Sequence, residues 1–274
     1  MTVVGLISPG DMGASIGAAV TAPGAEVIWA GNARSEATHK RADTAGLRDC
    51  GTVAAMVESA DIILSICPPH DAEAVATEIS SSGFQGLFAD CNAIAPQKSC
   101  QLSSLFPEGR FVDGGIVGGP AWKAESGTML YLSGAAASTV DELFPGSPLG
   151  TQVIGDDVGS ASAMKMAFAA YTKGSTALLA AILGVAESHG VREVLEGQWG
   201  ETFTDQTHKR LVNNSTKAWR FSGEMLEIAR TFEEAGYPDG FHQSAAEIFD
   251  RLSEFKDAKA EDIQVMLQAM ARSS

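Results

Sequence analysis

Lys165 is the only charged side chain between Asp157 and Lys173, and its neighbours in the segment SASAMKMAFAAY are mostly small or apolar. Burial penalises the charged form of an amine, so a lysine in such surroundings is expected to have a lowered pKa. Such an amine can exchange a proton with a substrate near neutral pH. A lysine on an apolar helix can also extend its charged end to water. Because the N-terminal half carries features of a dinucleotide-binding domain, we favour proton transfer and expect Lys165 to be catalytic.

The chain begins with an apolar segment that runs through a glycine turn into small residues, GLISPGDMGASIGAAV. Backbone N–H groups and the positive end of a helix dipole meet at such a turn, where a dinucleotide would place its pyrophosphate. Ser8, Gly10 and Gly13 occupy the three glycine positions of the pattern G-x-G-x-x-G. Taken alone, the turn also fits an ordinary β-to-α connection. The residues that we expect to bind the cofactor here are Ser8, Pro9, Gly10, Asp11 and Met12.

The loop after the second predicted strand, at residues 26–30, offers Asn32, Arg34 and Ser35 and has no carboxylate before Glu36. Three further basic side chains follow one to two turns later, at His39, Lys40 and Arg41. Sites that prefer NAD place an acidic residue here to bind the ribose 2′-OH, whereas a 2′-phosphate requires cations and hydroxyl donors. A single loop arginine can also be an ordinary solvated charge. The position of Arg34 favours NADP over NAD, with Asn32, Arg34 and Ser35 as its ligands.

Strands and helices alternate along the first half of the chain, which predicts a mostly parallel sheet with right-handed crossovers. Ligands of such sheets bind beyond the carboxyl ends of the strands. The predicted strands at 61–67 and 87–91 end at Cys67-Pro68 and at Asn92, and we expect these three residues to line the cofactor. Further strands are predicted at 111–119, 128–134 and 151–155.

Strand signals stop after Asp157, and nearly everything that follows has a helical pattern. We therefore expect an α/β Rossmann-like N-terminal domain over residues 1–157 and an all-α substrate and dimerisation domain over residues 158–274. The first helix of the second half, predicted over 158–189, is unusually long and apolar for a soluble protein. A second copy of the chain would cover it, which predicts a homodimer.

Composition narrows the possible partners. The chain has 274 residues with 34 Asp and Glu against 19 Lys and Arg, a formal net charge of −15. This charge argues against nucleic acid or an anionic membrane as a partner. We found neither an uninterrupted apolar run of about 18 residues nor the basic start of a signal peptide, and we expect a cytoplasmic protein. The four cysteines lack metal-ligand spacing, so we expect reduced thiols and no metal site.

Four segments together resemble the β-hydroxyacid dehydrogenases of the 6-phosphogluconate dehydrogenase-like superfamily, over the whole chain. GLISPGDMG is similar to the family's G-x-x-G-x-G-x-M-G, DCNAIAP to D-x-S-T-x-S-P, DGGIVGGP to D-x-P-V-S-G-G, and GSASAMK to G-x-G-x-x-x-K. The resemblance implies that Lys165 is the general acid and base and that Asn92, Gly118 and Gly119 bind substrate. It also implies that Arg34 and Ser35 match the Arg-Thr/Ser pair of NADP-using members.

The substrate side departs from the family pattern. Phe168 and Ala169 stand where members carry an asparagine after the lysine, and Val117 replaces a serine. Trp122 and Phe168 would suit a substrate pocket that tolerates aromatic groups, although core packing explains either residue equally well. The segment at 219–249 resembles a branch of the superfamily whose C-terminal domain has no settled function.

We therefore expect hydride transfer between a nicotinamide and a small hydroxy acid or a related alcohol or carbonyl compound. An NADPH-dependent imine reductase and a non-catalytic NADP-binding protein are the alternatives. In the second half, we expect His242 to be a satisfied structural histidine or a helix cap. We expect Glu224 and Glu227 to lie on a solvated helix face.

Overall fold

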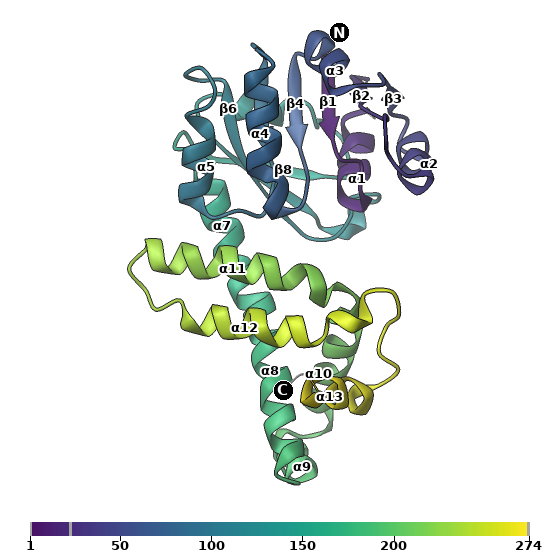
Figure 1. Ribbon diagram of the computed structural model, residues 1–274, viewed down its shortest axis with the longest axis vertical. Coiled ribbons are helices and arrows are strands. Elements are labelled where there is room, and N and C mark those ends of the chain that lie inside the picture. The colour runs from purple at the N-terminus through teal and green to yellow at the C-terminus, as the bar shows by residue number, and fades with distance from the viewer. Residues whose placement is uncertain (1, 22–23, 273–274) are drawn as a thin grey trace. The chain divides into compact units, whose positions relative to one another are not determined.

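The computed structural model describes residues 2–21 and 24–272, and the chain forms two compact units that divide between Met166 and Ala167 (Figure 1). The expected boundary was near residue 157. The difference arises because helix α7 (Ser160–Ala169) begins with hydrogen bonds to the sheet of the first unit, so that its first turns belong to that unit.

The first unit contains one eight-stranded sheet in the order β3-β2-β1-β4-β5-β6-β7-β8. Every neighbouring pair is parallel except β6 and β7, which confirms the expected Rossmann-like, mostly parallel sheet. The strands are β1 (Val3–Ile7), β2 (Glu26–Trp29), β3 (Arg48–Asp49), β4 (Ile62–Ser65), β5 (Leu87–Asp90), β6 (Phe111–Val117), β7 (Met129–Ser133) and β8 (Gly150–Gly155).

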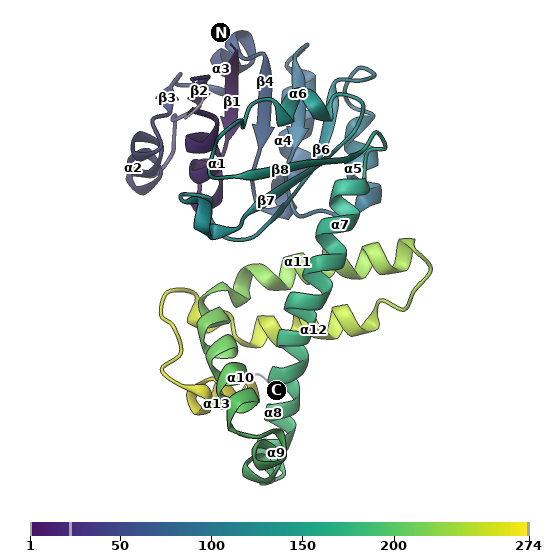
Figure 2. The ribbon, with the colours of Figure 1, turned by 180° about the vertical axis from the view of Figure 1, so that it is seen from behind.

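Helices cover both faces of this sheet, because the strand side chains alternate between two hydrophobic clusters. In β1, Val4 and Leu6 join one cluster and Ile7 joins the other. The first cluster includes α1 (Asp11–Thr21), α2 (Glu36–Thr44) and α6 (Ala137–Asp141). The second includes α3 (Val53–Ser59), α4 (Ala72–Ser81) and α5 (Pro96–Ser103), and Figures 1 and 2 show α4 and α6 on opposite faces.

One row of residues crosses the sheet where its central strands end. Ile7 pairs with Ser65, Ser65 with Asp90, and Asp90 with Asp113. The loops that follow β1, β4 and β5 therefore leave the sheet at the same level. Strand β6 continues past this row to Val117.

The second unit is helical. After α7 the chain makes a π-helical turn, Ala170–Gly174, and continues as α8 (Ser175–Ser188). A π turn leaves backbone groups without their usual helical partners. Here the guanidinium of Arg210 donates to the carbonyl of Thr172 and to the hydroxyl of Ser175, the latter at 2.7 Å. The remaining helices are α9 (Arg192–Trp199), α10 (Glu201–Asn214), α11 (Ala218–Glu234), α12 (Gly240–Arg251) and α13 (Ile263–Arg272).

The continuous helix from Ser160 to Ser188 is long and apolar enough to cross a membrane by length and composition. Its most apolar 18-residue window has a mean hydropathy of 1.3, and 33% of that window is buried inside the structure. The helix was expected over 158–189, but it contains no uninterrupted apolar run of 18 residues, because Lys165, Lys173 and several Ser, Thr and Gly residues interrupt it. Core helices of soluble proteins meet the same criterion, so the helix is weak evidence for a membrane span.

Three polar residues of the second unit differ from expectation. Glu227 is only 6% exposed and accepts a hydrogen bond from Arg230, while Glu224 forms an ion pair with Lys173. The two glutamates are therefore not a solvated face. His242 is 5% exposed, and its Nδ1 atom has no hydrogen-bond partner within residues 2–21 and 24–272. Burial lowers the pKa of His242, so it is a buried neutral side chain rather than a satisfied one.

Candidate dinucleotide and catalytic site

The glycine turn after β1 has the backbone shape of a phosphate-binding loop, although serine replaces its first glycine. Ser8 has a φ of 61°, a left-handed conformation that usually requires glycine, and its carbonyl accepts a hydrogen bond of 2.7 Å from the N–H of Gly10. A Cβ at Gly13 would lie 2.4 Å from the Ser8 carbonyl oxygen, so only glycine fits there. A Cβ at Gly10 would meet no atom within 4 Å, which leaves its outer side open. The turn therefore fits a dinucleotide pyrophosphate at the start of α1.

The loop after β2 presents an exposed arginine. Arg34 is exposed, and none of the hydrogen bonds or ion pairs found in the described part of the chain involves its guanidinium. Ala33 adopts a φ of 59°, which turns the loop sharply before α2. Ser35 is the N-cap of α2, and its hydroxyl accepts from the N–H of Thr38 at 3.3 Å. Asn32 is exposed beside them, so the three predicted phosphate ligands share one short loop.

Asp49 was not expected at this site, whereas Arg41 was expected only as a cation one to two turns after the loop. The Nε atom of Arg41 donates to the carbonyl of Pro9 at 3.3 Å, which brings a second guanidinium against the glycine turn. Asp49, at the end of β3, accepts from the N–H groups of Gly31 and Gly51 at 2.9 and 2.7 Å. A carboxylate thus lies beside the end of β2, but these bonds make it a support for the loop.

Asn92 connects the ends of β4 and β5. Its Oδ1 atom accepts from the N–H of Cys67 at 2.6 Å, and its Nδ2 donates to Ser65 Oγ and to Asp90 Oδ2 at 3.1 and 2.9 Å. The side chain is 3% exposed, so its two donors are used inside the protein. Asn92 therefore holds the Cys67-Pro68 loop in place, and a direct contact from its amide to a ligand remains a prediction.

Burial sets the protonation of two groups in this network. It raises the pKa of the Cys67 thiol to about 11, which keeps the sulfur protonated at neutral pH. Burial also raises the pKa of Asp90 to about 7, and the nearby Asp113 carboxylate adds to the shift. Hydrogen bonds from Asn92 act in the opposite direction.

The loop after β6 returns to the dinucleotide helix. Gly118 has a φ of 128° and packs against Thr128, whose hydroxyl donates to the carbonyl of Gly119 at 2.7 Å. The N–H of Ala121 then donates to Ser15 Oγ of α1 at 2.9 Å. The predicted substrate residues Gly118 and Gly119 are therefore tied to the helix that begins at the glycine turn. Trp122 follows in the same loop and is 43% exposed, so it is not a core residue.

Lys165 lies on α7 against strand β6. A Cβ placed on Gly115 would lie 3.0 Å from the Cβ of Lys165, so the helix approaches the strand closely at this point. Gly115 lies two residues beyond Asp113, past the row where β4 and β5 end. Lys165 thus lies at the carboxyl edge of the sheet and is half-buried there. Phe168 belongs to the second unit and is 43% exposed, so its place in a pocket remains a prediction.

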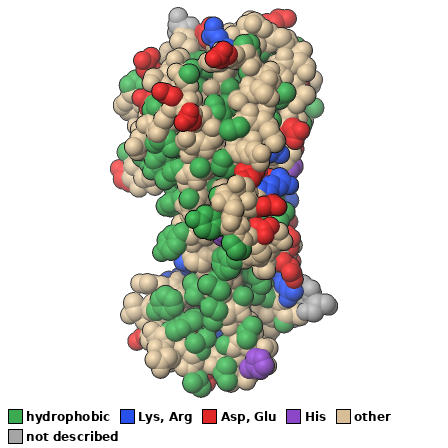
Figure 3. Space-filling model, turned by 90° about the vertical axis from the view of Figure 1, so that its left-hand side faces the viewer, with side chains coloured by type: hydrophobic (Ala, Val, Ile, Leu, Met, Phe, Trp, Pro, Cys, Tyr) green, Lys and Arg blue, Asp and Glu red, His purple; other side chains and the backbone are tan. Residues whose placement is uncertain are grey.

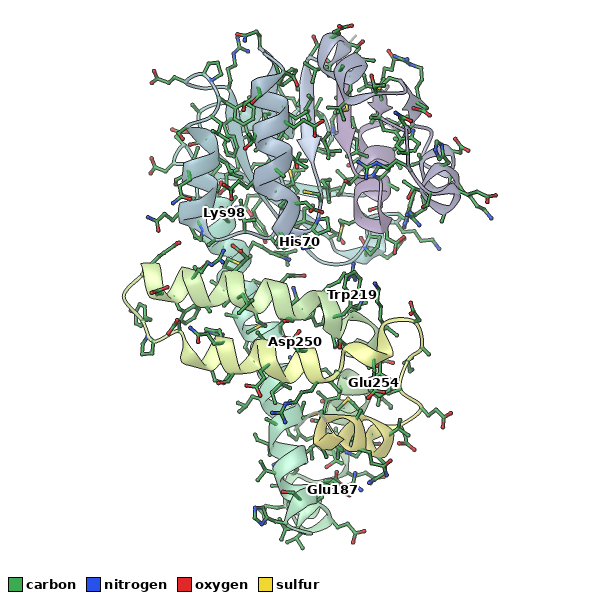
Figure 4. All side chains as sticks on the ribbon, viewed as in Figure 1. His70, Lys98, Glu187, Trp219, Asp250 and Glu254 are labelled. Atoms are coloured by element: carbon green, nitrogen blue, oxygen red, sulfur yellow. The ribbon has the colours of Figure 1, made fainter. Side chains whose placement is uncertain are left out.

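Lys98 is a second lysine that sequence reasoning overlooked. It lies in the first turn of α5, and Figure 4 labels it with His70 at the lower edge of the sheet unit. Its side chain is 19% exposed, and its Nζ lies 3.7 Å from Glu73 Oε2. Its positive charge also lowers the pKa of the buried Asp90 relative to burial alone. No group of three or more His, Cys, Asp or Glu side chains that could hold a metal ion occurs in the ranges 2–21 and 24–272.

Two family models match the chain. Residues 3–89 match the model described as NADP oxidoreductase, coenzyme F420-dependent, and residues 183–252 match a domain of unknown function, DUF1932. An uncharacterized 28.5 kDa protein from the 7S RNA 5′ region of Methanothermus fervidus is 30% identical over 202 residues, which are 72% of this chain and 78% of that protein.

Solved structures share the fold over nearly the whole chain. A conserved protein of unknown function, described as similar to 3-hydroxyacid dehydrogenases, is 26% identical with a TM-score of 0.67 and covers 97% of this chain and 99% of its own. The 3-hydroxyisobutyrate dehydrogenase of Mycobacterium tuberculosis with L-serine is 17% identical, with a TM-score of 0.69 and coverage of 98% and 99%.

Imine-reducing enzymes share the fold as well. A reductive aminase from Aspergillus terreus with NADPH and ethyl levulinate is 15% identical, with a TM-score of 0.55 and full coverage of both chains. An imine reductase variant from Myxococcus stipitatus with NAD+ is 17% identical, with a TM-score of 0.56 and coverage of 98% and 99%.

Proposed function

Because the chain belongs to the β-hydroxyacid dehydrogenase-like superfamily of NAD(P)-binding oxidoreductases, in the branch with a DUF1932 domain, we propose that it is an NADP-dependent dehydrogenase or reductase. Its substrate class is a small hydroxy acid or a related alcohol or carbonyl compound. Lys165 serves as the general acid and base.

One observation carries this proposal: Lys165 and the glycine turn lie at the same edge of one sheet. The turn follows Ile7, the first residue of the paired row that crosses the sheet. Lys165 packs against Gly115, which lies two residues after Asp113, the last residue of that row. The half-buried Lys165 lies at the carboxyl edge of a doubly wound sheet, and this edge is where such sheets bind ligands.

Different residues of the first unit would bind different parts of the cofactor and the substrate. Ser8, Gly10 and the start of α1 would hold the pyrophosphate, while Arg34, Ser35 and Arg41 would hold the 2′-phosphate of NADP. A bound nicotinamide supplies a hydride acceptor or donor. In oxidation, Lys165 accepts the proton from the substrate hydroxyl as the hydride leaves its carbon, and in reduction it returns that proton. The backbone of Gly118 and Gly119 would bind a carboxylate or carbonyl oxygen of the substrate.

The first test measures nucleotide binding through fluorescence quenching, once with NADPH and once with NADH. We expect tighter binding of NADPH, and Arg34→Ala should weaken it by about 10- to 100-fold, because a charge-assisted hydrogen bond contributes about 1.5–3 kcal/mol. NADH affinity should stay the same. Arg110→Ala is a matched control, because it removes the same side chain directly before β6, at the opposite edge of the sheet.

The second step is turnover. Protein with NADP+ is screened with 3-hydroxyisobutyrate and L-serine, and protein with NADPH is screened with carbonyl compounds and cyclic imines. Lys165→Met should abolish the turnover of a hydroxy acid while NADPH still binds. Turnover of cyclic imines alone would favour the imine reductase. Binding of NADPH without turnover in either set, unchanged by Lys165→Met, would identify a non-catalytic NADP-binding protein.

We also propose that the protein is a cytoplasmic homodimer. Hydrophobic side chains are prominent on the surface of the second unit (Figure 3), and α8 and α9 line an apolar groove of about 450 Å³ there. Val185 lines this groove and is 61% exposed, and Val194 of α9 is 76% exposed. A second copy of the chain would remove this apolar surface from water. The net charge of −15 supports the absence of nucleic-acid and anionic membrane partners.

A further inference from the structure

Five hydrogen bonds within the described part of the chain end on the buried carboxylate of Asp113, in β6. Oδ1 accepts from the hydroxyls of Ser99 and Ser162 at 2.8 and 2.6 Å. Oδ2 accepts from the hydroxyl of Ser133 at 3.1 Å, and from the N–H groups of Gly159 and Ser162 at 3.0 and 2.9 Å. Asp113 is 1% exposed. A carboxylate so far from water is tolerated because these donors replace its hydration.

Most of these donors belong to the start of α7. The first N–H groups of a helix have no partner within the helix, and they carry its partial positive charge. Asp113 satisfies two of them, at Gly159 and Ser162, and the Ser133 hydroxyl satisfies a third, at Ala161, at 3.0 Å. The sheet therefore anchors the helix through a buried charge that faces the positive end of the helix dipole.

The same strand sets how closely the helix approaches. Gly115 faces α7 from the same side of β6 as Asp113, because the two residues are separated by one position. A Cβ at Gly115 would lie 2.5 Å from the carbonyl oxygen of Ala161 and 3.0 Å from the Cβ of Lys165. Lys165 lies one helical turn after Ser162, on the same face. Asp113 and Gly115 thus determine the register and the height of Lys165 above the strand.

From this arrangement we infer that Asp113 is a positioning residue for Lys165. It holds the first turn of α7 in place and so fixes the position of Lys165 at the carboxyl edge of the sheet. The inference rests on the proposed role of Lys165 in proton transfer. Asp113 itself acts only through the helix, and the function that it serves is the alignment of the Lys165 amine.

The test follows the Lys165 amine directly, without a substrate. Lysines of the full-length protein are reductively methylated with ¹³C-formaldehyde, and the Lys165 signal is assigned by its loss in Lys165→Arg. Its chemical shift is then titrated with pH by NMR, with NADP+ present. We expect the titration midpoint of this signal to move by about half a pH unit or more in Asp113→Asn, in which an amide donor replaces an acceptor. Affinity for NADPH should remain within about twofold of the native protein.

Two serines provide a matched pair in case Asp113→Asn fails to fold. Ser162→Ala and Ser99→Ala each remove one hydroxyl from the same oxygen of Asp113, but only Ser162 belongs to α7. We expect similar losses of melting temperature in both variants, and a moved Lys165 midpoint in Ser162→Ala alone. Equal midpoints in both serine variants and the native protein would overturn the inference. Undiminished turnover of a hydroxy acid by Lys165→Met would overturn the proposed function instead, and the two failures are distinguishable because the NMR readout does not depend on turnover.

Discussion

At the scale of single residues, Asp90 couples the stability of the protein to pH. Burial raises the pKa of its carboxyl from 3.8 to about 7 in the folded state. Between these values the folded state binds more protons than the unfolded state, so stability falls as pH rises from about 4 to about 7. The loss from this one group is on the order of 4 kcal/mol. Asp90→Asn stays uncharged and should show a smaller fall in melting temperature over this range.

Thermal unfolding at several pH values between 4 and 8 measures this effect. Asp71→Asn is the control, because the Asp71 side chain is 52% exposed and its charge remains in contact with water. Superimposable curves of melting temperature against pH for the native protein and Asp90→Asn would show that Asp90 ionises without cost.

Local patterns made part of the site predictable from sequence. The turn at Ser8 and the loop at Arg34 are each formed by consecutive residues, so residue types and spacing were enough to predict both loops. Asn92 was predicted from the end of its strand and from a motif, whereas Asp113 was visible only as the first residue of the segment DGGIVGGP. The partners that define their roles, Cys67 for Asn92 and Ser162 for Asp113, are 25 and 49 residues away in the chain. Such pairings depend on strand register, which the sequence pattern did not specify.

At the scale of elements, the contact between β6 and α7 depends on the absence of a side chain at Gly115. Gly115→Ala would place a methyl group 2.5 Å from the Ala161 carbonyl oxygen, so the helix must move away from the strand. Overpacking of this kind costs about 1–3 kcal/mol. We expect a lower melting temperature and, because Lys165 moves with the helix, a loss of turnover on the order of tenfold or more.

Gly155→Ala, in β8, is the matched control. A Cβ at Gly155 would meet no atom within 4 Å, so this variant should melt and turn over like the native protein. A Gly115→Ala variant with native turnover would mean that the position of Lys165 tolerates a shift of α7.

Element types were easier to predict than element ends. The strands, the helices of the first half and the helical second half follow from hydrophobic periodicity. The two-residue strand β3 is too short to have a period, and the π turn at Ala170–Gly174 depends on Arg210, which is distant in sequence. The boundary was expected near residue 157 because strand signals stop there, whereas the two compact units divide after Met166, since the N-terminal hydrogen bonds of α7 lie with the sheet.

At the scale of the whole molecule, the apolar groove of α8 and α9 provides a test of assembly. Val185→Glu combined with Val194→Glu would place two carboxylates in the proposed dimer interface, and burial of an unpaired charge costs several kcal/mol. We expect the mass measured by light scattering to fall from that of a dimer to that of a monomer. Leu105→Glu, at a 41% exposed leucine of the first unit, should leave the mass unchanged. A native protein that has the mass of a monomer would refute the dimer.

The capping of α7 by Asp113 also constrains how this chain can be divided or recombined. A fragment that ends at residue 157 would keep the Ser99 and Ser133 donors to Asp113 but lose those of Gly159 and Ser162. A fragment that ends after Ala169 would retain all of them. In a chimera that exchanges helical halves between relatives, the junction should therefore fall after Met166, so that the buried carboxylate and the helix that it caps are inherited from the same parent.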